Sequence, residues 1–139
     1  MSDERATGTI DKDKAHIYDE LVMDDHSLFR SHSKTDVYVM AAALGYYFKE
    51  IKEIPSTNKQ DLFVTTTLGS GTVDKLWILK SIAISFSGIE VLKSMKEIIK
   101  ICDSYANAGI DRLDQIHKNS DDEVVEYAML MAESLNNDD

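Results

Sequence analysis

Between Ser94 and Lys118, apolar residues recur every three or four positions, and polar residues fill the positions between them. This is the period of an α-helix with one buried face. The apolar positions are Met95, Ile98, Ile99, Cys102, Tyr105, Ala106, Gly109, Ile110, Leu113 and Ile116. The pattern predicts one amphipathic helix of several turns. Its apolar face is built for packing and holds no cluster of reactive groups.

Four further segments have helical patterns. The run from Val37 to Phe48 is apolar on nearly all sides, which is typical of a helix contacted from several directions. The other three are a short helix at 14–23 and longer helices at 73–86 and 124–135. The helix at 73–86 is expected to bury Trp77 in the core.

Serine residues mark the predicted starts of several helices. Ser33 is followed three residues later by Asp36, which is the spacing of a capping interaction at a helix N-terminus. The same spacing recurs in the pairs Ser87 and Glu90, Ser94 and Glu97, and Ser120 and Glu123. These pairs predict short joints between consecutive helices.

Residues 56–68 are ambiguous. The run from Phe63 to Thr67 favours a strand locally, but a single strand in a helical chain has no partner. We therefore interpret this segment as a short helix or an extended connector. The sequence as a whole predicts an all-α fold, a compact single-domain bundle of five to six helices over residues 12–135. Residues 1–11 are expected to form a disordered tail and residues 136–139 a frayed end.

Size and charge narrow the class of protein. The 139 residues fit one domain, and the net charge of −10 repels nucleic acid overall and favours solubility or a basic partner. No apolar run reaches the roughly 18 residues of a membrane span, and residues 1–10 lack an apolar signal core. The single cysteine, Cys102, lies on an apolar face and is expected to be a buried thiol. We expect a soluble cytoplasmic protein.

The sequence contains no motif of a familiar active site. Residues 69–72 precede a helix but lack the length and the lysine of a phosphate-binding loop, and no GxSxG elbow occurs. The acidic run at 24–26 lacks the glycine and distal glutamate of a calcium loop. The four histidines lack HExxH spacing and are expected at the surface or in capping roles: His16, His26, His32 and His117. We therefore expect no catalytic residue, cofactor or metal, and no enzymatic activity.

One region combines basic and aromatic residues. Its members, at the two ends of the Val37–Phe48 helix, are Arg30, His32, Lys34, Tyr46, Tyr47, Lys49 and Lys52. Such a combination can contact nucleic acid or a partner protein. The alternative interpretation is a plain helix end where lysines offset the negative pole of the helix dipole.

Three stretches together resemble a known family. They are the segments 36–46 (DVYVMAAALGY), 88–92 (GIEVL) and 105–110 (YANAGI). In this order and spacing they are similar to the small Dnd system-associated proteins, although Ala108 stands where that family commonly has glycine. The family is encoded with prokaryotic DNA-phosphorothioation defence systems, in which backbone sulfur marks host DNA and a restriction module attacks unmarked DNA.

The resemblance implies an accessory role in antiphage defence and transfers no catalytic motif. The leading hypothesis is a non-catalytic accessory subunit that docks on a larger ATPase or nuclease of the system, with self-association left open. Two alternatives remain. One is a DNA-binding regulator that uses the Arg30–Lys52 region, and the other is an acidic DNA mimic that blocks a nuclease or repressor.

Overall fold

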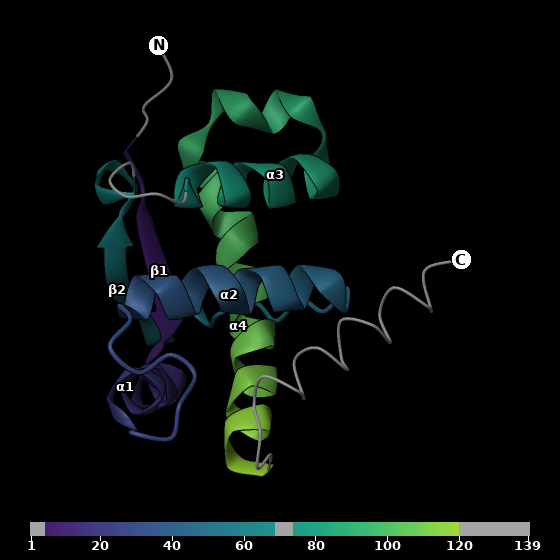
Figure 1. Ribbon diagram of the computed structural model, residues 1–139. Helices are drawn as coiled ribbons and strands as arrows, with labels where there is room; N and C mark the ends of the chain where they lie inside the picture. The colour runs from purple at the N-terminus through teal and green to yellow at the C-terminus, as the bar shows by residue number, and fades with distance from the viewer. Residues whose placement is uncertain (1–4, 69–73, 120–139) are drawn as a thin grey trace.

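The computed structural model describes residues 5–68 and 74–119, and these form four α-helices and one two-stranded sheet (Figure 1). The helices are α1 (Ala15–Met23), α2 (Lys34–Tyr47), α3 (Lys75–Ser87) and α4 (Met95–Asn119). The strands are β1 (Thr7–Asp11) and β2 (Lys59–Val64). Four 3-10 turns join them: η1 (Lys12–Lys14), η2 (Ser56–Asn58), η3 (Thr65–Thr67) and η4 (Ile89–Lys93). The prediction of an all-α bundle of five to six helices is therefore wrong.

The long helix α4 is the centre of the molecule, as its periodic apolar face indicates. Thirteen of its 25 residues are buried, and α2 crosses in front of it in Figure 1. Two glycines allow the two helices to touch. A Cβ atom at Gly45 would lie 2.1 Å from the carbonyl oxygen of Tyr105, and one at Gly109 would lie 1.8 Å from that of Ala41. The crossing therefore depends on backbone contact that a larger residue would prevent.

The helix starts follow the serine pattern only in part. The Ser33–Asp36 capping box is confirmed, because each side chain accepts a hydrogen bond from the other residue's backbone N–H. Ser94 also accepts the Glu97 N–H at 3.2 Å. The box predicted at Ser87 is wrong, because Ser87 is the last residue of α3 and the chain turns at Gly88 with φ of +90°. The predicted box at residues 120–123, the helix at 124–135 and the frayed end lie outside the described residues.

The sheet is the main correction to the sequence analysis. β1 and β2 pair antiparallel, with Thr7 opposite Val64 and Asp11 opposite Lys59. Residues 7–11, which were expected to lie in a disordered tail, thus supply a partner strand. The interpretation of 56–68 as a short helix or connector is wrong for residues 59–64, which form β2, whereas residues 65–67 form the 3-10 turn η3. Gly8 explains the close fit, because a Cβ atom there would lie 2.1 Å from the ring of Phe63. The bare backbone at Gly8 lets that ring pack against the core.

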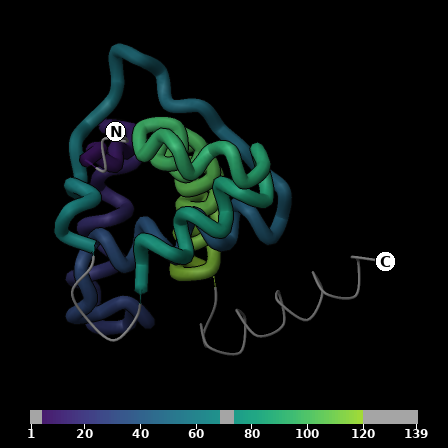
Figure 2. The backbone as a smooth tube through the Cα atoms, turned by 90° about the horizontal axis from the view of Figure 1, so that it is seen from above, coloured from purple at the N-terminus to yellow at the C-terminus, as the bar shows by residue number. Residues whose placement is uncertain are grey.

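The connector between α2 and β2, residues 48–58, is hydrogen-bonded to α4. Figure 2 shows it arching round the opposite side of α4 from α3. The backbone N–H of Lys52 donates to the carbonyl of Ser104 at 3.0 Å, and Asn107 Nδ2 donates to the carbonyl of Lys52 at 3.1 Å. These bonds satisfy the buried amide of Asn107 and fix where the chain leaves α2.

Candidate functional site

Three aromatic rings from three different helices meet at the ends of α2 and α3. The rings of Tyr46 and Phe86 each pack edge-on against Tyr105, with centroids 5.9 Å apart in both pairs. A hollow of about 300 Å³ beside them is lined by Tyr46, Tyr47, Lys49 and Tyr105. We call the residues Tyr46, Tyr47, Phe86 and Tyr105 the aromatic surface. Its edge-on ring pairs have the geometry that aromatic quadrupoles favour.

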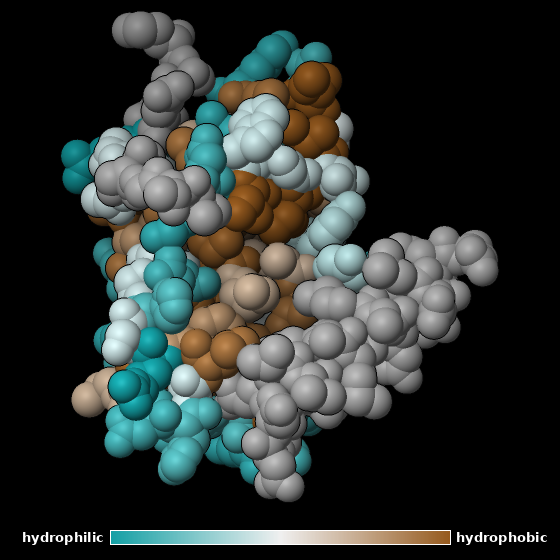
Figure 3. Space-filling model, in the orientation of Figure 1, coloured by the Kyte–Doolittle hydropathy of each residue, from teal (hydrophilic) through white to brown (hydrophobic). Residues whose placement is uncertain are grey.

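Two of these rings are open to solvent. Phe86 is 54% exposed and Tyr46 is 40% exposed, whereas Tyr105 is 6% exposed and forms the floor. Ile89, in η4 just beyond Phe86, is 69% exposed. Figure 3 shows apolar side chains gathered over α3 and its end, and in the strip between α3 and α2. Large exposed apolar side chains grouped in this way mark an interaction surface more often than single ones do.

The basic and aromatic residues selected from the sequence fall into two groups. Tyr46, Tyr47 and Lys49 lie together at the C-terminal end of α2. Arg30 and Lys34 lie before and at the start of that helix, which at 1.5 Å per residue is roughly 20 Å away. The structure therefore does not bring the whole set into one patch.

Carboxylates neutralise three of the selected cations. Arg30 pairs with Asp25, and Lys34 pairs with Asp19. The Nζ atom of Lys52 lies 2.7 Å from Asp111, which also binds Lys14. These ion pairs reduce the positive potential of the Arg30–Lys52 region.

A partly buried carboxyl group that no sequence pattern indicated lies where β1 meets α4. Asp103 accepts the hydroxyl of Tyr38 at 2.6 Å, the backbone N–H of Thr9 at 3.1 Å and the Thr9 hydroxyl at 2.8 Å. Burial raises the pKa of Asp103 to about 6, although these three donors favour the charged form. The sequence showed only an acidic residue on the polar side of a helix, and β1 is what covers it.

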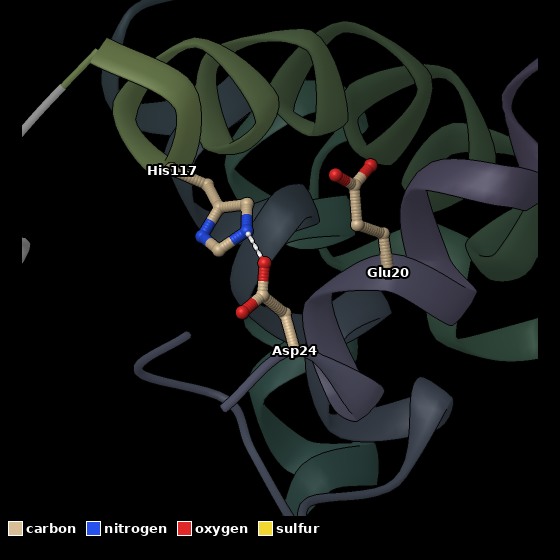
Figure 4. Close-up of side chains that lie close together, drawn as sticks. All are labelled: Glu20, Asp24 and His117. Carbon is tan, nitrogen blue, oxygen red and sulfur yellow. Dashed lines mark hydrogen bonds and ion pairs between the residues drawn. The ribbon is translucent and has the colours of Figure 1, made fainter. Parts of the chain in front are cut away.

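Three further side chains could hold a divalent cation. Glu20 and Asp24, one turn apart at the end of α1, face His117 on the last turn of α4 (Figure 4). Their ligand atoms lie within 4.8 Å of one another, and His117 Nε2 is 2.9 Å from Asp24 Oδ2. The backbone N–H of His26 and the hydrogen bond from His117 both lower the pKa of Asp24. At this spacing Asp24 and His117 form a direct pair that ties α1 to α4.

The burial of three residues can be compared with the prediction from the sequence: His117, Trp77 and Cys102. His117 was expected in a surface or capping role, but only 7% of its side chain is exposed. Trp77 was expected in the core and is 55% exposed, because it lies on the outer side of α3. Cys102 is a buried thiol as expected. Its sulfur donates to the carbonyl of Leu79, and burial raises its pKa.

These features define a small protein built round one long helix, with a two-stranded ribbon on one side and an open aromatic surface at one end. Residues 9–139 match the family model of DNA sulphur modification system-associated protein 4, so the chain belongs to that family. The resemblance to Dnd-associated proteins is thereby confirmed. No curated protein and no solved structure matches the chain.

The family description makes this an accessory protein of a DNA sulphur modification system. Among the helices of the described residues, none is long and apolar enough to cross a membrane.

Proposed function

We propose that this protein is a non-catalytic accessory subunit of a DNA sulphur modification system, and that it docks on a larger protein of that system through the aromatic surface. The observation that carries the proposal is the Phe86 ring. It is 54% exposed and yet is held in a defined position by Tyr105, which also holds Tyr46. The family description supplies the system to which the partner belongs.

Physical chemistry favours docking at such a place. Aromatic side chains bring a large apolar area with few rotatable bonds, so ordering them on binding costs little entropy. Aromatic residues are accordingly enriched among the residues that dominate binding energy. The hollow beside Tyr46 adds a concave contact, and Lys49 at its rim adds a polar group. An acidic protein with this surface fits a partner that offers apolar side chains surrounded by basic ones.

The test is co-purification from host cells that express the whole system. A tagged chain is captured under gentle conditions, and retained proteins are identified by mass spectrometry. We expect a larger protein of the sulphur modification system to be retained, and to be lost with the double variant Tyr46→Ser/Phe86→Ser.

Trp77→Ser provides the matched control. Trp77 is as exposed as Phe86 and belongs to the same helix, but their separation of nine positions, or two and a half turns, places it on the opposite side of α3. The control should retain the partner. A protein that stays alone, or a partner that the control loses and the double variant keeps, would contradict the proposal.

The aromatic surface could instead bind a second copy of the chain. Light scattering distinguishes this self-association from docking on a larger subunit. A particle of twice the 15.6 kDa chain mass that the double variant disrupts would assign the surface to a second copy instead of a larger subunit. The two sequence alternatives remain separate predictions. A DNA mimic would compete with duplex DNA for the captured partner, whereas a docking subunit would not.

A further inference from the structure

A second hollow, on a different part of the molecule, is lined by cations. It lies between β1 and the first turns of α4 and has a volume of about 450 Å³. Its basic residues are Arg5, Lys59, Lys96 and Lys100, and its acidic residue is Asp103. We call these four basic residues and the space between them the cationic groove. In a chain with a net charge of −10, this grouping of like charges is unexpected.

The lysines of the groove differ from most other basic side chains of the described residues in forming no ion pair with a carboxylate. Eight basic side chains outside the groove form ion pairs: Lys14, Arg30, Lys34, Lys52, Lys75, Lys93, Arg112 and Lys118. Lys59, Lys96 and Lys100 form none with any residue in the ranges 5–68 and 74–119. Their charges are therefore available to an external anion.

The position of Lys96 and Lys100 carries a cost that an anion would relieve. The two residues are four positions apart on one face of α4, where like charges repel. Lys96 also lies in the first turn of the helix, where the dipole disfavours cations. Asp103 follows on the same face and accepts hydrogen bonds from Tyr38 and Thr9. The charge of Lys59 lowers the pKa of Asp103, but the two side chains form no ion pair.

The chemistry of the lining selects phosphate over bases. Lysine ammonium groups act as point charges toward phosphate oxygens, and the aliphatic and threonine side chains beside them offer no ring on which a base could stack. Contacts of this kind give affinity without sequence recognition.

We propose that the cationic groove binds the phosphodiester backbone of duplex nucleic acid. The inference is independent of the aromatic surface, with which the groove shares no residue. With three phosphates neutralised by the three lysines, the logarithm of the affinity should fall with the logarithm of salt concentration with a slope of about −3.

The experiment measures fluorescence anisotropy of a labelled duplex of about 20 base pairs, titrated with the full chain at several salt concentrations from about 50 mM upward. We expect binding that Lys96→Gln/Lys100→Gln weakens roughly tenfold, with a salt slope reduced by about 2. Asp103→Asn, which removes the negative charge from the lining, should strengthen binding. Circular dichroism confirms that each variant is folded.

Lys34→Gln/Lys118→Gln is the matched control, because it removes the same charge at the start of α2 and the end of α4. It should bind the duplex like the unmodified protein, and so should Tyr46→Ser/Phe86→Ser. The proposal is wrong if no duplex binds at low salt, or if the control loses as much affinity as the groove variant. It is also wrong if pyrophosphate binds the groove and duplex does not, since the site would then be one for small anions.

Discussion

At the scale of single residues, the fold sets the charge of Asp103. Its pKa of about 6 exceeds the 3.8 of an exposed aspartate because burial disfavours the carboxylate. A group whose pKa rises on folding stabilises the folded state fully below the unfolded pKa. That contribution is lost as the pH rises through the folded pKa. The stabilising contribution of protonated Asp103 is therefore lost between about pH 4 and pH 6.

The variant Asp103→Asn tests this directly. An amide oxygen can still accept from Tyr38 and the Thr9 backbone, and the Thr9 hydroxyl can rotate to accept from the amide nitrogen. The variant thus keeps the hydrogen bonds and loses the charge. We expect it to be more stable than the unmodified protein near pH 8, by at most about 3 kcal/mol, and equally stable near pH 4.

Urea unfolding of both proteins at a series of pH values provides the measurement. Three other carboxyl groups have lowered pKa values, so their protonation reduces the stability of both proteins at acid pH: Asp24, Asp36 and Asp111. Their contributions cancel in the stability difference between the two proteins. A difference that does not change with pH, or a variant that is less stable near pH 8, would contradict the account of this carboxyl group.

At the scale of elements, the crossing of α2 over α4 fixes where the aromatic rings meet. Gly45→Ala tests the crossing, because helix propensity predicts that the variant is more stable and packing predicts that it is less stable. Propensity alone favours alanine by about 1 kcal/mol. The new methyl group would overlap the Tyr105 carbonyl, so we expect a net loss of about 2 kcal/mol.

The measurement is the free energy of unfolding from denaturant titration. Ala43→Gly in the same helix, at a half-buried position, should cost only the propensity term of about 1 kcal/mol. A stabilised Gly45→Ala variant would show that the two helices do not touch at this point.

Local signals explain which elements the sequence predicted. The apolar period of residues 94–118 and the serine cap at Ser33 are encoded within a few neighbouring residues, and α4 and the start of α2 follow them. The pairing of Thr7 with Val64 joins residues more than fifty positions apart. Neither strand shows a long alternating pattern, and the Gly8–Phe63 contact that fits them together is a tertiary feature.

At the scale of the whole molecule, the candidate surfaces also combine residues that are neighbours in the chain with residues that only the fold brings together. Tyr46, Tyr47 and Lys49 are neighbours in the chain, so sequence alone could select them. Phe86 and Tyr105 join them only because three helices converge. In the cationic groove, the four-residue spacing of Lys96 and Lys100 is visible in the sequence, but only the pairing of β2 with β1 brings Lys59 beside them.

The proposed function requires that a larger protein of the sulphur modification system bind the aromatic surface. The most direct test is calorimetric titration of the purified chain into each purified protein of that system. We expect saturable binding to one of them, unchanged by Trp77→Ser and at least tenfold weaker with Tyr46→Ser/Phe86→Ser. Binding to none of these proteins, or equal affinity in the unmodified protein and the double variant, would contradict it.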